Sequence, residues 1–347
     1  MTAFNPKASL AQRKQAVTRL IGELNADKRH VLVGPWRSEL GFEASYWIPF
    51  LAFLRHQVKH FDERAAIITR GGMGPLYSHL AAQGIDLYFL RDVKDVRREN
   101  LRGQADTGLL KQTQVTEWDE AVLDDAADKL NIPRPFHVLH PAWMYWALWP
   151  YWAEDAGLKY LTKLTDYAPI PKPPLPPECP LPPNYVAVKF YARATFQYPH
   201  PEVGEWVQRT VATIAAQAPV VVLASAPDYD DHLDIPLAGP NISSLPTDVA
   251  PEQNLYLQAS VLAHAAAFVG TYGGVAQLAL RMSVPSLSVY AQWGGTSHAH
   301  YALSSYLSKV QNVPFPMGSL QDSVFWRQIT SVPEKPQMAM HLVGTAA

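Results

Sequence analysis

The proline-rich segment over residues 168–184 constrains the fold of this chain more than any other stretch. Nine of its seventeen residues are proline. Because proline fixes φ and lacks an N–H donor, neither a helix nor a central strand can run through the segment. We therefore expect an extended, stiff connector between two folded parts, and interpret it as a domain linker. An alternative stays open, in which the segment is a ligand for a proline-recognising partner domain.

Strand and helix patterns alternate on both sides of this segment. Before it, we expect strands over 30–33, 65–69, 86–90 and 136–139, and helices over 9–25, 43–56, 73–83 and 115–130. After it, we expect strands over 185–190, 220–224, 265–269 and 286–290, and helices over 201–217, 255–263 and 275–282. Such alternation predicts an α/β protein with two Rossmann-like, doubly wound domains that face a cleft.

The predicted domain boundaries follow from this alternation. They are an N-terminal domain over 1–167, the linker over 168–184, a second domain over 185–317, and a tail over 318–347. The tail contains a last predicted helix over 322–330, which we expect to pack back on the first domain.

Composition narrows the class of protein. The chain has 347 residues, of which 48% are hydrophobic, so it can bury a large core. A net charge of −2 argues against nucleic acid as a partner. The lone Cys179 cannot form an internal disulfide, which favours a reducing, cytoplasmic location. No apolar run approaches the roughly 20 residues of a membrane-spanning helix. Peripheral contact with the inner membrane and the oligomeric state are left open.

The segment Phe268-Val-Gly-Thr-Tyr-Gly-Gly-Val-Ala-Gln-Leu-Ala-Leu280 has the pattern of a strand, a glycine turn over 270–274 and a helix. Amides at a helix N-terminus are unpaired and carry partial positive charge, so the turn suits a phosphate. The candidate nucleotide-binding residues are Gly270, Thr271, Tyr272, Gly273, Gly274 and Gln277, helped by Gln258 and Ser260. The alternative is an ordinary strand–helix connection.

Two further loops after predicted strands carry polar residues. Lys189 and Arg193 leave the strand over 185–190 and could neutralise a diphosphate, Arg193 better because its guanidinium binds phosphate in a bidentate manner. The alternative is a surface ion pair. Ser225, after the strand over 220–224, could contact a phosphate or ribose. We interpret the acidic cluster that follows, Asp228, Asp230, Asp231 and His232, as a solvated loop rather than a metal site.

The loop Gly34-Pro-Trp-Arg-Ser-Glu-Leu-Gly-Phe-Glu43 follows the first predicted strand. Glu39 and Glu43 are four residues apart, so they share a face if the turn is helical. A carboxylate at a strand end suits a general base, while the alternative is a helix cap. His298 and His300 would share a face if extended, but a catalytic zinc site needs about three protein ligands, so we predict no metal.

Aromatic residues gather over 143–152, where two interpretations compete. They either pack an irregular helix or form a platform that stacks on sugar rings.

These residues resemble a known group, the GT-B glycosyltransferases, in which the second domain holds the nucleotide-sugar and no bound metal is required. The segment over 268–280 is similar to the donor-site segment of such enzymes. The loop over 34–43 resembles the Gly-Pro-Trp/Glu-x-Gly-x-Glu loop of bacterial surface-polysaccharide (capsule and lipopolysaccharide) glycosyltransferases, spelled here Glu39-Leu-Gly-Phe-Glu43.

The resemblance implies a metal-independent transfer of a sugar from a nucleotide-sugar donor to a glycan or lipid-linked acceptor. By the same resemblance, Glu39 or Glu43 would be the base, and Lys189 and Arg193 would face the donor phosphates. Arg193 would also stabilise the leaving nucleotide. Two alternatives stay open, a nucleotide-sugar 2-epimerase of the same fold and a non-catalytic protein that binds nucleotide-sugar or glycan.

Overall fold

The computed structural model describes residues 5–107, 111–192, 196, 201–224, 233–290 and 298–319. Contacts divide the chain into two compact units. The first unit comprises Met1–Pro171 and Pro251–Tyr256, and the second comprises Lys172–Ala250 and Leu257–Ala347. The main division therefore falls inside the proline-rich segment.

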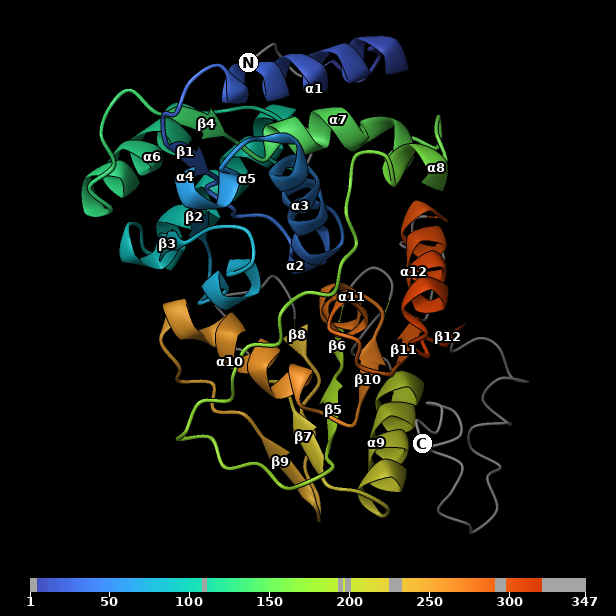
Figure 1. The fold of residues 1–347 in the computed structure, drawn as a ribbon. Coiled ribbons are helices and arrows are strands. Elements are labelled where there is room, and N and C mark those ends of the chain that lie inside the picture. The colour runs from blue at the N-terminus through green and yellow to red at the C-terminus, as the bar shows by residue number, and fades with distance from the viewer. Residues whose placement is uncertain are drawn as a thin grey trace. The chain divides into compact units, whose positions relative to one another are not determined.

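A four-stranded parallel sheet forms the centre of the first unit (Figure 1). Its strands are β1 (Val31–Val33), β2 (Ala65–Thr69), β3 (Gln83–Asp86) and β4 (His137–Leu139), in the order β3-β2-β1-β4. The three residues of β1 are fully buried, as expected for a parallel strand covered on both faces. Because β4 returns to the other side of β1, the direction of winding changes between β1 and β4.

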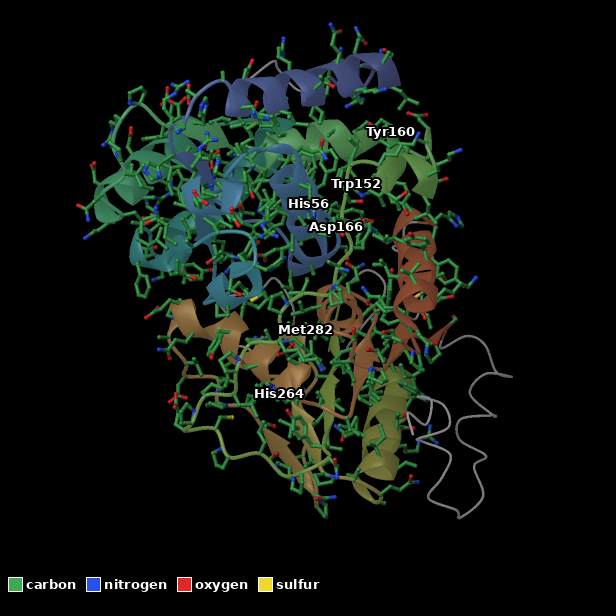
Figure 2. The ribbon with its side chains drawn as sticks, viewed as in Figure 1. His56, Trp152, Tyr160, Asp166, His264 and Met282 are labelled. Carbon is green, nitrogen blue, oxygen red and sulfur yellow. The ribbon has the colours of Figure 1, made fainter. Side chains whose placement is uncertain are left out.

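Helices and short turns surround this sheet. In chain order they are α1 (Leu10–Asn25), α2 (Leu40–Phe42), the π segment η1 (Glu43–Trp47), α3 (Ile48–Gln57), α4 (Phe61–Arg64), the 3₁₀ turns η2 (Gly74–Tyr77) and η3 (Leu87–Phe89), α5 (Val93–Thr107), α6 (Glu117–Lys129), α7 (Ala142–Trp152) and α8 (Leu158–Leu161). Tyr160 on α8 donates to the carbonyl of Ala147 on α7 at 2.6 Å, and His56 on α3 contacts Asp166 after α8 at 3.0 Å (Figure 2). These contacts fix α8 against α3 and α7.

The aromatic residues of α7 belong to the core of the first unit. Trp143, Tyr145, Trp146 and Tyr151 are all buried. They continue an aromatic cluster from the first loop, in which Trp36 stacks on Trp47 at 5.8 Å between ring centroids. The burial of these four rings favours the packing interpretation, because enclosed rings offer no face to a sugar, while Trp149 and Trp152 are half-buried.

The second unit contains a six-stranded parallel sheet in the order β12-β11-β10-β5-β7-β9. These strands are β5 (Val186–Lys189), β7 (Val220–Val222), β9 (Ile242–Ser244), β10 (Ala267–Thr271), β11 (Ser286–Tyr290) and β12 (Met317–Ser319). Numbered along the chain and read from β9, the order is 3-2-1-4-5-6, that of a dinucleotide-binding Rossmann sheet. Its topological switch point lies between β5 and β10, where Lys189 is in register with Gly270.

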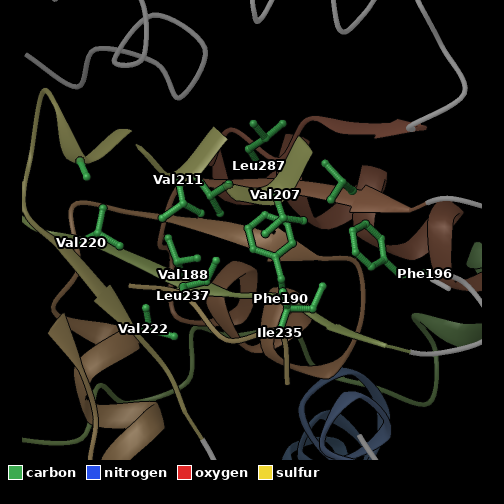
Figure 3. Close-up of a cluster of buried hydrophobic side chains, with 13 residues drawn as sticks. Val188, Phe190, Phe196, Val207, Val211, Val220, Val222, Ile235, Leu237 and Leu287 are labelled. Carbon is green, nitrogen blue, oxygen red and sulfur yellow. The ribbon is translucent and has the colours of Figure 1, made fainter. Parts of the chain in front are cut away.

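The remaining elements are α9 (Pro201–Ala215), α10 (Pro251–Ala263), α11 (Gly274–Arg281), α12 (His298–Gln311) and a small antiparallel pair, β6 (Tyr191–Ala192) with β8 (Leu233–Asp234). All belong to the second unit except Pro251–Tyr256 of α10, which belongs to the first. α9 packs its apolar face on the sheet in the cluster of Figure 3. Val207 and Val211, four residues apart on α9, belong to this cluster together with Val188 of β5 and Val222 of β7. This core supports the carboxyl ends of β5 and β10 from one side of the sheet.

The expected fold class, two α/β units with parallel, Rossmann-like sheets, is confirmed, while the cleft between them stays a prediction. The helix expected over 73–83 is wrong, because Gly71 and Gly72 adopt positive φ and only a 3₁₀ turn follows. β3 spans Gln83–Asp86 and the 3₁₀ turn η3 follows it, so the strand expected over 86–90 is wrong beyond Asp86. The sequence patterns also missed α5 and α12. The helix expected over 322–330 lies outside the described residues.

No helix in the described part of the chain is long and apolar enough to cross a membrane.

Arg13 anchors α1 to the rest of the first unit. Its guanidinium is fully buried and lies over the Trp146 ring at 5.0 Å. It donates to the carbonyls of Asn5, Pro6 and Ala8 at 2.9–3.0 Å and to that of Trp146. One side chain therefore satisfies four buried or half-buried carbonyl groups, which nothing shorter could reach.

We expect Arg13→Ala to lower the free energy of unfolding of the first unit by about 3 kcal/mol, because it leaves these carbonyls without a donor. Urea unfolding followed by tryptophan fluorescence measures the loss. Arg19→Ala is the matched control on the same helix, since Arg19 is exposed and pairs only with Glu23 at 3.7 Å. Its effect should stay within about 0.5 kcal/mol. Equal effects of the two variants would contradict the anchoring role.

Candidate functional site

Glu39 lies at the carboxyl edge of the first sheet, in the loop between β1 and α2. It is the N-cap residue of α2 and has an extended backbone. Its side chain is 35% exposed, and its Oε2 lies 3.1 Å from Lys111 Nζ. The same ammonium lies 3.5 Å from the centroid of the Phe42 ring. Glu39 is therefore a carboxylate that solvent reaches and that a cation and an aromatic ring hold in place.

Glu43 begins the π segment four residues later and is 0% exposed. The Tyr77 hydroxyl donates to its Oε1 at 2.6 Å, and among the described residues its Oε2 has no hydrogen-bond partner. Burial raises the pKa of Glu43 to about 7, although the Tyr77 hydrogen bond and the Arg70 charge oppose the rise. Burial likewise raises the pKa of nearby Asp86. Glu43 therefore exchanges its proton close to neutral pH inside the core.

The two glutamates have different surroundings, although the Glu43 amide donates to the Glu39 carbonyl at 3.1 Å, as in a helical turn. Glu39 is the N-cap residue and is partly exposed, whereas Glu43 is buried. A general base must come within hydrogen-bonding distance of the proton it removes. Glu39 meets that condition for a ligand in solvent, and Glu43 does not in this arrangement.

The amide side chains of buried Gln112 and half-buried Asn100 clamp the loop that carries Glu39. Gln112 donates to the Pro35 carbonyl at 2.8 Å and accepts from the Arg37 amide at 3.0 Å. Asn100 donates to the Arg37 carbonyl at 3.0 Å and accepts from Arg37 Nη1 at 2.7 Å. A loop held at both backbone and side chain loses little further entropy when a ligand binds.

A buried carboxylate, Asp119 on α6, links the loops after β1 and β4. Its Oδ1 lies 3.3 Å from Arg37 Nε, and its Oδ2 lies 3.3 Å from His140 Nε2. The His140 Nδ1 accepts the Ala142 amide at 3.1 Å, so the proton of a neutral ring is on Nε2, facing Asp119. Burial alone would raise the pKa of Asp119, but His140 and Arg37 outweigh it and hold that pKa well below its usual range.

Most of this network has no signal in the sequence patterns. His140 directly follows β4, so the rule that flagged other loops after strands could have found it. Asp119 carried only a capping signal, Thr116-Glu-Trp-Asp119, which the structure does use. Gln112 and Asn100 lie on segments that no local pattern connects to the first loop.

In the second unit, Lys189 ends β5 at the switch point. Its side chain is buried, and its ammonium donates to the Leu223 carbonyl at 3.0 Å and to Gln258 Oε1 at 2.8 Å. Asp234 Oδ2 lies 3.5 Å away. An ammonium has three N–H donors, so a direct contact with phosphate would have to displace one of these acceptors. Lys189 instead ties β5 to α10 and β8 beneath the carboxyl edge.

The glycine turn begins later than the sequence suggested, because β10 continues through Gly270 and Thr271. A Cβ on Gly270 would lie 2.2 Å from the Lys189 carbonyl oxygen, so close strand pairing requires glycine there. The turn itself is Tyr272 and Gly273, and α11 starts at Gly274. Gly270 and Thr271 are therefore strand residues, and the expectation that they form the turn is wrong.

The amides at the start of α11 lie at the carboxyl end of β10. The first helical bond runs from the Gln277 amide to the Gly273 carbonyl at 3.0 Å, so the amides of residues 274–276 have no acceptor within the helix. In the described part of the chain, no side chain caps this helix. These donors, with the positive end of the helix dipole, suit a phosphate.

The side chains of Tyr272 and Gln277 turn toward the protein. The Tyr272 hydroxyl lies 3.3 Å from Ser304 Oγ on α12, and burial raises its pKa, which hydrogen bonds from Ser304 and Gln277 oppose. Thr271 Oγ1 accepts the Tyr191 amide at 3.2 Å. Gly273 and Gly274 are half-buried, so the backbone of the turn, rather than its side chains, faces outward.

Several predicted residues cannot be placed. Arg193, Ser225 and the acidic cluster over 228–232 lie outside the described residues. His298 and His300 begin α12, and two positions apart on a helix they do not share a face, as they would in an extended segment. Among the described residues, no three His, Cys, Asp or Glu side chains are grouped so that they could hold a metal ion.

Comparisons with known proteins found similar folds only among solved structures. No protein-family model and no curated protein matches the sequence. A glycosyl transferase family 9 protein from Veillonella parvula is 12% identical, with a TM-score of 0.45 over 92% of this chain and 97% of that one. Escherichia coli heptosyltransferase WaaC with ADP is 13% identical, with a TM-score of 0.41 over 87% and 99%.

A third similar structure, from Listeria monocytogenes, is named as a UDP-N-acetylglucosamine 2-epimerase. It is 10% identical, with a TM-score of 0.33 over 82% of this chain and 88% of that one. These likenesses concern the overall fold and assign no activity to this chain.

The raised pKa of Glu43 predicts a pH-dependent stability. An unfolded chain would lose this proton near pH 4.5, whereas the folded chain keeps it up to about pH 7. The free energy of unfolding that this group contributes therefore falls as pH rises between these values, by at most about 1.4 kcal/mol per pH unit, and is constant above.

We expect Glu43→Gln to remove this slope, because the amide still accepts the Tyr77 hydroxyl but does not titrate. Urea unfolding of wild type and variant from pH 5 to 8 measures the difference between their slopes. Glu120→Gln, an exposed change on α6, is the control and should keep the wild-type slope. Parallel curves for wild type and Glu43→Gln would contradict a buried, titrating Glu43.

Proposed function

We propose that the chain is a glycosyltransferase that transfers a sugar from a nucleotide-sugar donor to a glycan or lipid-linked acceptor. The observation that carries this proposal is the strand order of the second unit. That order puts the switch point between β5 and β10, directly beside the predicted glycine turn. Ligands of open α/β sheets bind beyond the carboxyl ends of the strands at such a point.

On the donor side, most of the proposed contacts with the phosphates come from backbone amides. The amides of residues 274–276 would bind the diphosphate and stabilise the charge that develops on it as the glycosidic bond breaks. Arg193 keeps its proposed role as a phosphate ligand, and Ser225 as a phosphate or ribose contact. Lys189 would not contact the phosphate itself, and would act as a buried cation that holds Gln258 and Asp234 in place.

On the acceptor side, we propose Glu39 as the general base. It would remove the proton from the acceptor hydroxyl as that oxygen attacks the anomeric carbon. Its solvent-exposed carboxylate and the clamped loop support this role better than the buried carboxylate of Glu43. Glu43 would act as structural support beneath α2. The sequence resemblance, and no structural observation, implies that the transfer needs no metal.

Two alternative functions make different demands. A 2-epimerase would convert a nucleotide-sugar without any acceptor, and a binding protein would hold it without turnover. The accessible Glu39 beside Lys111 and Phe42 in the first unit favours an acceptor-dependent reaction, since donor binding alone does not require it.

A nucleotide panel tests the donor site. We expect one of UDP, GDP, ADP, CMP and dTDP to raise the melting temperature with or without Mg²⁺, by about 2.7 kcal/mol of stabilisation at a hundredfold excess over its dissociation constant. Differential scanning fluorimetry measures the shift, with inorganic phosphate as the control for non-specific anion binding. If no nucleotide shifts the melting temperature, the donor site is wrong. A shift that requires Mg²⁺ would overturn metal independence.

Conservative variants separate the two glutamates. Glu39→Gln should lower kcat for sugar transfer by about 10²- to 10⁴-fold while nucleotide affinity stays within about twofold, because only the proton acceptor is lost. Glu43→Gln is the matched control and should change kcat by less than about tenfold. Nucleotide release from the donor, with and without candidate acceptors, measures both. A larger loss in Glu43→Gln than in Glu39→Gln would reverse the assignment.

A further inference from the structure

Tyr191 reaches the glycine turn from the short strand that follows β5 in the chain. It lies in β6, two residues after Lys189, and is 2% exposed. A Cβ built on Gly273 would lie 1.9 Å from the Tyr191 hydroxyl oxygen and 3.2 Å from its Cζ. The hydroxyl therefore occupies the space that any other residue at position 273 would fill with its side chain.

This contact, and not backbone strain, explains the glycine at position 273. Gly273 has a φ of 173°, which is extended backbone that any residue adopts. A second contact joins the same two segments, since the Tyr191 amide donates to Thr271 Oγ1 at 3.2 Å. Tyr191 thus meets the turn on both of its sides, at Thr271 with its backbone and at Gly273 with its hydroxyl.

We propose that Tyr191 is a positioning residue of the donor site, which sets where Gly273 and the first amides of α11 lie. The proposal rests on the proposed function, since it assumes that these amides bind a nucleoside diphosphate. Amide donors bind an oxyanion only over a narrow range of distance, so a displacement of a few tenths of an ångström weakens them. Tyr191 acts through the backbone of the turn and does not itself touch the reacting atoms.

A pair of single variants and their double variant test this role. Gly273→Ala introduces a methyl group against the Tyr191 hydroxyl, so the turn must shift, and we expect affinity for the nucleoside diphosphate to fall about tenfold or more. Tyr191→Phe removes the hydroxyl, which leaves Cζ as the nearest ring atom at 3.2 Å. The double variant should therefore bind more tightly than Gly273→Ala alone. Isothermal titration with UDP, GDP, ADP, CMP and dTDP measures the affinities.

Tyr185→Phe is the matched control within the same unit. Tyr185 is buried, and its hydroxyl donates to the Val261 carbonyl at 2.5 Å, away from the turn. This variant should lower the unfolding midpoint yet leave diphosphate affinity within about twofold, and combining it with Gly273→Ala should restore nothing. If the role of Tyr191 is purely structural, Tyr191→Phe should likewise lower the unfolding midpoint, leave diphosphate affinity unchanged and restore nothing to Gly273→Ala.

The outcomes distinguish this proposal from the proposed function. A double variant whose loss equals the product of the two single losses overturns the role of Tyr191, because the two residues are then independent. If all variants bind the nucleoside diphosphate as tightly as the wild-type chain does, the role of Tyr191 is also overturned, while the donor site stands. A wild-type chain that binds none of the five nucleotides overturns the proposed function, and the role of Tyr191 fails with it.

Discussion

Strands β5 and β10 pair closely along Gly270, and the carboxyl edge of the second unit depends on that pairing. With a Cβ at 2.2 Å from the Lys189 carbonyl oxygen, any other residue at position 270 would push the two strands apart. The chain continues from these strands into Tyr191 on one side and Gly273 on the other. Separating β5 from β10 would therefore move the hydroxyl of Tyr191 away from the turn that it contacts.

Buried charge accompanies the strand ends in both units. A charged group removed from water costs several kcal/mol unless hydrogen bonds and opposite charges compensate it. Lys189 is compensated by two oxygen acceptors and Asp234, and Arg37 by Asn100 and Asp119. Glu43 takes the other route and gains a pKa near 7. Buried, hydrogen-bonded charges hold a loop in one position, because their hydrogen bonds are strong and depend on direction.

The sequence predicted those features that depend on local patterns. Apolar runs and their spacing indicated most strands of both sheets, and the prolines after 168 indicated the division. The errors have local causes. α5 carries many charged and few apolar residues, and Gly270 is read as a turn residue unless the neighbouring strand is known. The burial of Glu43 and the approach of Asp119 to Arg37 depend on tertiary contacts across 34 and 82 residues, which no sequence window contains.

The two units begin with the same winding, 3-2-1-4, yet treat their switch points differently. In the first unit, the loops after β1 and β4 converge on the buried carboxylate of Asp119, so the protein itself supplies an anion beside Arg37 and His140. In the second unit, the corresponding loop presents helix amides that no described side chain caps. A buried carboxylate therefore lies at the switch point of one sheet, while uncapped helix amides lie at that of the other. Under the proposed function, we expect the second unit to bind the nucleotide at these amides and the first unit to supply the proton acceptor, Glu39.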